Sequence, residues 1–417
     1  MRYNALQILR QGLSGNRGWR PAWRKAEPKP SYDIVVVGGG GHGLATAYYL
    51  ARRHGVKNVA VLEKGWIGSG NVGRNTTIVR ANYGLPGNSE FYSHSLKLWE
   101  GMEQELNYNA MHSQRGLINL FHSDGQRDAF ARRGNAIRNQ GDDAELLDTE
   151  GVRKLVPYLD FEQTRFPIYG GLYQPRGGTA RHDAVAWGYA RAADRLGVDI
   201  VENCEVTGID VESGRVTGVQ TSRGPIRAER VGLAVAGRSS QVAALAGLRL
   251  PIESHVLQAF VTEGLKPVID HVVTYGMGHF YISQSDKGGL VFGGDLDFYP
   301  SYASRGNLPM VEHVVEAGMT LMPMIGKARM LRSWGGIMDM SSDGSPIIDR
   351  TPVEGLYFNG GWCYGGFKAV PGSGDCFAHL LATGEPHDAA ARFRLDRFAT
   401  GHGLMDEEGT GAQHNLH

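Results

Sequence analysis

The sequence lacks three things: more than a few cysteines, long hydrophobic runs and any excess of charge. Only three of its 417 residues are cysteines, Cys204, Cys363 and Cys376, and their spacing forms neither a CxxC pair nor a metal-binding set. The odd count argues against a disulfide framework, and a reducing cytoplasm is the expected location. No stretch reaches the ~18 apolar residues of a membrane span. Basic and acidic residues number 43 each, which disfavours nucleic acid and anionic membranes as partners.

Glycine, in contrast, is abundant. The chain has 59 glycines, about twice the usual share of roughly 7%. Many tight turns and close approaches between backbone and ligand are therefore expected, as nucleotide cofactors require. Apolar residues make up 41% of the chain and charged residues 21%, which is typical of a globular protein. The length allows two or three domains.

The most informative segment covers residues 32–64. The run YDIVVV has the composition of a strand, and GGGGHG after it supplies the fingerprint glycines Gly38, Gly40 and Gly43. A helical run, LATAYYLARRHG, leads to a second strand, NVAVLEK. This strand ends in Glu63, about 20 residues after Gly43, which is the spacing of an acid that binds ribose. The strand, glycines, helix, second strand and acid together predict a βαβ unit that binds a dinucleotide. An ordinary glycine-rich turn would not explain all of these features in register.

Further pieces of a nucleotide fold recur along the chain. The pattern predicts a helix and strand over 184–206, a hairpin around 212–215, a strand ending at 237 with a helix after it, and a strand and helix over 356–384. Residues 250–294 instead alternate as antiparallel strands do, and a helical pattern covers 308–322. Such interlacing is typical of two-domain flavoproteins. A simple NAD dehydrogenase, the alternative fold, usually carries its nucleotide domain as one block.

We therefore predict an α/β fold, a two-domain flavoprotein in which a Rossmann-like FAD-binding domain is interlaced with an antiparallel β-sheet substrate domain. The predicted FAD-binding domain covers 31–100, 171–250 and 330–400, the substrate domain covers 101–170 and 251–329, and a polar tail covers 401–417. Residues 1–30 form a basic arm with seven lysines and arginines against Glu27. The arm lacks the apolar core of a secretory signal. A transit peptide is one explanation, and we favour an arm that lies on a partner subunit.

Four segments carry a resemblance to a known family. They are VVVGGGGHGLATAYYLARRHGVKNVAVLEKGW, GRNTTIVRANYG, YQPRGGTARHDAVAWGYAR and NGGWCYGGFKAVPGSGDCFAHLLATGEPH. The first is a general FAD signature, and the chain resembles the glycine/D-amino-acid oxidase family of FAD enzymes over nearly its whole length. The other three are more specific and resemble the beta subunits of heterotetrameric sarcosine oxidases.

The resemblance implies a reaction and a set of partners. Such a beta subunit binds FAD non-covalently, where sarcosine is oxidised, and carries an FMN attached to a histidine at the interface with the alpha subunit. Electrons pass from FAD to FMN and then to oxygen, which gives hydrogen peroxide. The alpha subunit carries NAD and a folate site that collects the one-carbon unit as methylenetetrahydrofolate. Without folate, formaldehyde accompanies glycine. Small gamma and delta subunits complete the heterotetramer.

The resemblance assigns the substrate carboxylate to Arg80, in TTIVRANY, and to Lys368, in GGFK. A guanidinium gives a bidentate, orienting contact, and an ammonium adds a point charge. Surface ion pairs are the ordinary explanation of a lysine or arginine, and only the motifs favour a site here. We expect positioning through the carboxylate to matter more than a strong catalytic base, because hydride transfer needs a neutral and aligned amine.

The expected anchor of the covalent FMN is His182, in GGTARHDAVAW. Attachment needs an imidazole nitrogen beside the flavin methyl group, and Asp183 is placed to orient or polarise the ring. Most of the 15 histidines of the chain are expected to be surface or core residues, and the motif singles out this one. Ala184 follows Asp183, so the motif contains no rival histidine.

The remaining site predictions concern FAD. The expected contacts are Gly38, Gly40, Gly41, His42 and Gly43 at the pyrophosphate, Glu63 and Lys64 near the ribose, Asn71 and Thr76 in the following loop, Val206 at the adenine, and Gly361, Gly365, Gly366 and Lys368 before the last helix. The N-terminus of that helix is expected to stabilise negative charge on reduced flavin. Plain turn chemistry is the alternative explanation of these glycines.

Two departures from the monomeric oxidases of the family are informative. Val291 aligns with the lysine that promotes their reaction with oxygen, so electrons are expected to leave FAD for another acceptor. Gly336 aligns with the cysteine that binds their FAD covalently, so FAD is expected to be non-covalent here. His255, His279 and Tyr281 are candidates for lining the cavity, and none is assigned as a catalytic base.

Two other functions stay open from the sequence. One is an FAD/FMN dehydrogenase for proline or for glycine derivatives such as dimethylglycine, because the motifs separate methyl and ring substrates poorly. The other is a non-catalytic flavoprotein that carries electrons or supports assembly, against which the pair Arg80 and Lys368 argues. Oxygen uptake with a panel of secondary amines distinguishes a sarcosine oxidase from the dehydrogenase. Anaerobic bleaching by sarcosine distinguishes it from the non-catalytic flavoprotein, which would not bleach.

Overall fold

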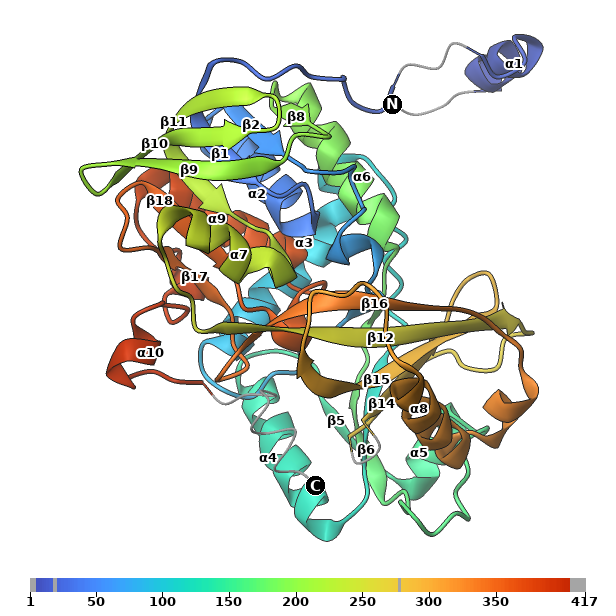
Figure 1. Ribbon diagram of the computed structural model, residues 1–417. Coiled ribbons are helices and arrows are strands. Elements are labelled where there is room, and N and C mark those ends of the chain that lie inside the picture. The colour runs from blue at the N-terminus through green and yellow to red at the C-terminus, as the bar shows by residue number, and fades with distance from the viewer. Residues whose placement is uncertain (1–4, 18–20, 277–278, 406–417) are drawn as a thin grey trace.

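The βαβ unit predicted over 32–64 lies at the centre of the first of two large sheets. The computed structural model describes residues 5–17, 21–276 and 279–405 (Figure 1). Strand β1 (Ser31–Val37) runs parallel to β2 (Val59–Leu62) on one side and to β11 (Gly224–Leu233) on the other. Helix α2 (Gly41–Arg53) connects β1 to β2. The strands are buried on both faces over most of their length, which explains their continuous apolar composition.

Other segments complete the first sheet. They are β8 (Asp199–Val201) beside β2, β18 (Leu356–Gly360) and β17 (Ile347–Arg350) beyond β11, and the hairpin of β9 (Val206–Glu212) and β10 (Arg215–Thr221), which pairs with β11. The predicted hairpin is confirmed. The strand expected up to 206 is shorter, because the chain leaves the sheet at Glu202, whose carboxylate accepts hydrogen bonds from Ile67 N and Trp23 Nε1. The strand expected to end at 237 ends at Leu233.

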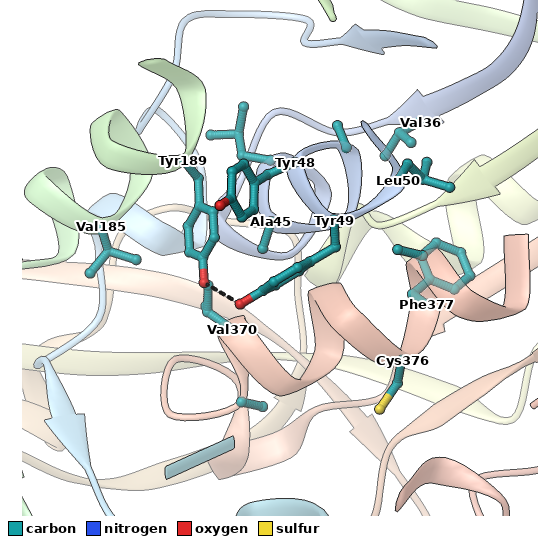
Figure 2. Close-up of a cluster of buried hydrophobic side chains, with 14 of the residues drawn as sticks. Val36, Ala45, Tyr48, Tyr49, Leu50, Val185, Tyr189, Val370, Cys376 and Phe377 are labelled. Carbon is teal, nitrogen blue, oxygen red and sulfur yellow. Dashed lines mark hydrogen bonds between the residues drawn. The ribbon is translucent and has the colours of Figure 1, made fainter. Parts of the chain in front are cut away.

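Helices cover one face of this sheet. They are α2, α3 (Asn88–Leu106), α6 (His182–Arg195) and α9 (Val370–Thr383). Tyr49 and Tyr189 lie in the core between them, with their hydroxyl oxygens 3.4 Å apart (Figure 2). A Cβ atom on Gly374 would lie 2.4 Å from that of Ala45, so only a glycine lets α9 pack this closely against α2. Gly374 therefore allows α9 to contact α2, the helix that follows the fingerprint glycines.

The second sheet is mostly antiparallel. Its order is β16 (Met330–Ser341), β12 (Ile252–Gly264), β15 (Gly289–Pro300), β14 (Phe280–Gln284), β13 (Val272–Tyr275), β4 (Leu117–Phe121), β6 (Gly170–Gln174) and β5 (Glu145–Asp148), and only β4 and β13 pair in parallel. The predicted boundaries at 171 and 330 assign β6 and β16 to the FAD-binding domain. They lie in the second sheet because β16 pairs with β12 along nearly its whole length and β6 pairs with β4 and β5.

The remaining elements flank the sheets. They are α4 (Asp124–Asn139), α5 (Thr149–Leu155), α7 (Ser239–Ala243), α8 (Leu308–Leu321), α10 (Arg397–Thr400), and the short pair β3 (Ile78–Val79) and β7 (Gly178–Thr179). Helix α1 (Ala5–Leu13) stands away from the body (Figure 1), and none of its residues is buried. Most of the predicted tail, 406–417, lies outside the described residues. Among the described helices, none is both long and apolar enough to cross a membrane.

Candidate functional site

A cavity of about 1020 Å³ lies between the two sheets, at the carboxyl ends of the parallel strands of the first. Its wall takes residues from the ends of β1, β2 and β11, from the loop 69–78, and from β12, β14 and β16 of the second sheet. Ligands of open α/β sheets bind at this edge of the strands. Ligand pockets typically measure about 300–1000 Å³, so this one is large enough for an extended cofactor and a small substrate.

The fingerprint glycines have separate tasks. Gly38, Gly40 and Gly41 line the cavity where α2 begins, and Gly38 has a φ of 110°, which favours glycine. A Cβ atom on Gly43 would lie 2.0 Å from the carbonyl oxygen of Gly38, so Gly43 permits contact between helix and strand. It does not line the cavity. The open backbone at the start of α2 suits a pyrophosphate.

Glu63 lies at the end of β2, where the predicted ribose contact should be. Its Oε2 accepts a hydrogen bond from Gly39 N at 2.9 Å, and its Oε1 accepts one from Gly65 N at 2.9 Å. These amides fix the carboxylate in the cavity wall and leave lone pairs for sugar hydroxyls. Lys64 and Val206 line the same end of the cavity. Asn71 and Thr76 line it from the loop 69–78.

His42 connects α2 with α9. Its Nδ1 is 2.5 Å from Ser373 Oγ, which in turn accepts a hydrogen bond from Asn359 Nδ2 at 2.8 Å. Its ring stacks on Trp362, with centroids 4.7 Å apart. Burial lowers the pKa of His42 to about 4, so the imidazole is neutral at physiological pH. The network therefore fixes the start of α2 without adding charge.

Arg80 and Lys368 line the same cavity. They come from opposite ends of the chain and are only 8% and 6% exposed. Arg80 follows β3, its guanidinium lies 4.5 Å above the ring of Tyr83, and its Nη1 donates a hydrogen bond to Asn82 Oδ1 at 2.7 Å. Two buried cations that face one cavity favour an anionic ligand.

The segment that carries Lys368 is fixed from behind. The carbonyl oxygen of Lys368 accepts hydrogen bonds from Ser95 Oγ and from Trp99 Nε1 of α3, each at 2.8 Å. The ammonium itself donates to the carbonyl oxygen of Tyr364 at 2.7 Å. The side chain therefore starts from a rigid backbone, which suits a group that orients a small ligand.

Three glycines precede the last helix and do not act alike. Gly366 lines the cavity, whereas Gly361 and Gly365 do not. Gly361 has a φ of 72°, which favours glycine, and a Cβ atom on Gly365 would lie 1.9 Å from Tyr92 Oη. These two glycines shape the loop, and their predicted contact with FAD stays a prediction.

His182 lies at the first position of α6, outside the cavity wall. Its Nδ1 is buried and has no hydrogen-bond partner, and burial lowers the pKa of its imidazole. An uncharged ring with an unpartnered nitrogen fits a covalent attachment. The Asp183 carboxylate pairs with the Arg181 guanidinium and accepts a hydrogen bond from Ala184 N. Its charge also raises the pKa of the His182 ring against the larger effect of burial, so its role of orienting or polarising that ring stays a prediction.

The other candidates divide between two places. His279, Tyr281 and Gly336 line the cavity, whereas His255 lies in a surface groove elsewhere. Val291 is not part of the cavity wall; it pairs with β12 and β14 inside the sheet. Its alignment with an oxygen-activating lysine therefore stays a prediction without a contact to the cavity.

Asp339 is a cavity residue that sequence reasoning missed. It lies on β16, 3% exposed, and its Oδ2 accepts hydrogen bonds from Gly361 N at 2.6 Å and Trp362 N at 3.2 Å. Burial raises the pKa of its carboxyl group from 3.8 to about 6. The carboxylate thus holds the loop that leads to Lys368. A lone aspartate in the run GGIMDMS gave no signal of this role.

Replacing Asp339 with asparagine should reduce the pH dependence of stability. The raised pKa means that the folded protein gains stability from the protonated carboxyl below about pH 4 and loses it as pH rises through 6. This loss amounts to about 3 kcal/mol, and asparagine does not incur it while its oxygen still accepts both amides. Unfolding free energies of both apoproteins at pH 4 and 7.5 measure the difference. Asp343→Asn, which breaks a buried pair with Arg397, is the control and should destabilise at pH 7.5. Parallel curves for wild type and Asp339→Asn would contradict the assignment.

One group of potential metal ligands lies away from the cavity. His94, Asp375 and His387 have ligand atoms within 4.8 Å of one another. Arg53 Nη1 contacts one oxygen of Asp375 at 2.5 Å, and the Nδ1 atom of His387 accepts a hydrogen bond from Ala389 N. Because these contacts already satisfy the carboxylate and one imidazole, we assign no metal here.

Comparisons with known proteins agree with the fold. The family model described as DAO, FAD dependent oxidoreductase, matches residues 33–380. The chain therefore belongs to this family of FAD-dependent oxidoreductases. It is 70% identical over 417 residues to the sarcosine oxidase subunit beta of Rhizobium meliloti (strain 1021), covering 100% of both chains. It is 50% identical over 391 residues to that of Arthrobacter sp, covering 94% of this chain and 96% of the relative.

A solved structure shows the same architecture. The L-proline dehydrogenase from P. horikoshii superposes with a TM-score of 0.85 at 27% identity, covering 90% of this chain and 99% of that one. The predicted α/β flavoprotein fold is thereby confirmed. At the identities above, the chain groups with the sarcosine oxidase beta subunits, an amine-oxidising branch of the family.

Proposed function

We propose that this chain is the catalytic beta subunit of a heterotetrameric sarcosine oxidase, in which sarcosine is demethylated to glycine. One observation carries the proposal: Arg80 and Lys368 are buried in the wall of the cavity that Gly38 and Gly40 of the fingerprint also line. A carboxylate bound by both cations would be fixed within the cavity, and the amine and methyl of so small a molecule would be fixed with it. The full-length similarity to sarcosine oxidase beta subunits supports the same substrate.

The cofactor proposal assigns each flavin to its own residues. Gly38, Gly40, Gly41 and Glu63 would hold FAD, and His182 would carry FMN. Bound FAD supplies a two-electron acceptor for the amine, and FMN supplies a route onward to oxygen. The segment before His182 adjoins the FAD cavity: Ala180 N donates to Thr77 O at 3.0 Å, and Thr77 lines the cavity. This proximity supports electron transfer between the two sites.

The partner proposal is an assembly with alpha, gamma and delta subunits, of which alpha would bind NAD and folate. Helix α1 supports it, because Leu6, Leu9 and Leu13 lie on one face and are 60–82% exposed. The chain after α1 is anchored to the body by Arg24 to Asp194, 2.7 Å apart. We propose that the apolar face of α1 packs on a partner subunit.

Anaerobic mixing with sarcosine tests the proposed function. The flavin absorbance should bleach with sarcosine, and subsequent air should restore it with formation of hydrogen peroxide. L-proline and dimethylglycine in the same assay test the dehydrogenase alternative, which the solved proline dehydrogenase structure favours. Light scattering of the native preparation should give the mass of a four-subunit complex. A protein that sarcosine does not bleach, or that has the mass of one chain, would contradict the proposal.

A further inference from the structure

Three titratable side chains form a line from the cavity wall to the surface. His279 directly precedes β14, lines the cavity and has a side chain that is 13% exposed. Its Nδ1 is 3.4 Å from Oδ1 of Asp295 on β15. The other oxygen of Asp295, Oδ2, is 3.6 Å from Nε2 of His313 on α8, which is 47% exposed. We propose that His279, Asp295 and His313 conduct a proton from the substrate amine to solvent.

The fold holds these groups in place. Helix α8 packs against β14 and β15 (Figure 1). This packing brings His313 of α8 within 3.6 Å of Asp295 on β15. A Cβ atom on Gly294 would lie 1.8 Å from the carbonyl oxygen of His279, so β15 passes directly against that residue. His279 itself has a φ of 46°, in the left-handed region. Non-glycine residues in that conformation are strained and concentrate at functional sites.

The other titratable groups around this line do not change their protonation state near neutral pH. Tyr281 and Tyr364 lie on the cavity side, and burial raises the pKa of Tyr281 to about 12 and that of Tyr364 higher still. Glu316 lies beside His313 at the surface, and its partner Arg165 lowers the pKa of its carboxyl group. The path is therefore left to the two imidazoles and the carboxylate between them, since an imidazole can accept a proton at one ring nitrogen and donate one from the other.

The inference rests on the proposed function. Sarcosine is an ammonium ion at neutral pH, and hydride leaves its methyl group only after the nitrogen has lost a proton. In the proposed path, an N–H bond of the ammonium breaks and a bond forms to His279 Nε2, on the side of the ring opposite Asp295. The Nδ1 proton of His279 moves to the oxygen of Asp295 that faces it, and rotation of the carboxyl group about its Cβ–Cγ bond turns the new O–H toward His313. That O–H bond breaks as a bond forms to His313 Nε2, and the N–H bond at His313 Nδ1 breaks to release one proton to water. One proton leaves the cavity and no electrons move.

Rates of anaerobic FAD reduction by sarcosine, measured from pH 6 to 10, test this path. His279→Asn is the sharpest variant, because asparagine tolerates the left-handed backbone. Its rate at pH 7 should fall by about 100-fold, a typical contribution of acid–base catalysis, and should approach wild type as pH rises and the amine arrives neutral. Asp295→Asn should behave alike. His313→Asn should lose less, and added imidazole should restore its rate.

His255→Asn is the matched control. His255 also pairs with a carboxylate, Glu253, at 3.1 Å, but it lies in a different groove, so its profile should follow wild type. If His279→Asn fails to retain FAD absorbance, the test rests on Asp295→Asn, whose rate of FAD reduction should also fall at pH 7 and approach wild type at high pH. Wild-type rates at every pH in these variants would overturn the proton path. A wild-type protein that sarcosine does not bleach would instead contradict the proposed function.

Discussion

Replacing Lys368 with methionine should weaken sarcosine binding about 100-fold while FAD stays bound. Lys368 is only 6% exposed, so little water competes for a carboxylate that it binds. Hydrogen bonds to charged groups contribute about 1.5–3 kcal/mol, and the upper end corresponds to roughly 100-fold in affinity. Methionine keeps the unbranched stem and removes only the charge. The apparent dissociation constant follows from anaerobic titration of flavin bleaching, and the absorbance before titration reports retained FAD.

Lys97→Met is the control for this change. Lys97 is an exposed lysine on α3, outside the cavity wall, so its removal should leave the titration unchanged. Arg80→Lys then separates charge from geometry, because it keeps one positive charge and loses the bidentate guanidinium. An intermediate affinity for Arg80→Lys would support a fork that orients the carboxylate. An unchanged affinity in both Lys368→Met and Arg80→Lys would exclude the carboxylate clamp.

The helices and strands that the sequence predicted best are those determined by residues close together in the chain. The strand, glycine turn, helix and second strand over 32–64 follow from periodicity and from one fingerprint, and the structure places Glu63 beside Gly39 as that pattern requires. The alternating runs over 250–294 likewise became strands of the second sheet. In each case the residues that determine the element are neighbours in the sequence.

What could not be predicted depends on contacts between distant segments. Asp339 acts on the amides of Gly361 and Trp362, and a strand pattern does not reveal which loop will pass its end. Asp183 was expected to orient or polarise His182, and the structure shows that its carboxylate also pairs with the guanidinium of Arg181. A charged neighbour two residues away competes with the role that a motif suggests, and only side-chain geometry decides between them.

The line from His279 to His313 illustrates the same limit. Its members are separated by 16 and 18 positions, from 279 to 295 and from 295 to 313. No periodicity links a strand start, a strand interior and a helix. Their proximity arises from antiparallel pairing of β14 with β15 and from the packing of α8 over both. Sequence reasoning placed His279 at the cavity and could not supply the carboxylate behind it.

Replacing His182 with alanine should abolish covalent flavin while leaving FAD bound. Because the Nδ1 of His182 has no hydrogen-bond partner, the change breaks no hydrogen bond at that atom, and alanine favours the helix that begins there. Acid precipitation of wild type should release one flavin and retain one on the polypeptide. The variant should release one and retain none, and its band on a denaturing gel should not fluoresce. Sarcosine should still bleach the remaining FAD, because His182 lies outside the cavity wall.

His112→Ala is a matched control for that result. His112 also has a buried nitrogen, Nε2, without a hydrogen-bond partner, and burial lowers its pKa as it does for His182. A fluorescent band in His112→Ala and a dark one in His182→Ala would show that attachment depends on position rather than on any buried, neutral imidazole. A fluorescent band in His182→Ala would remove the anchor. Electrons would then have to leave FAD by a route that does not use His182. The hydrogen bond between Ala180 and Thr77 connects the cavity to the segment just before α6, where His182 lies, and so supports no other route.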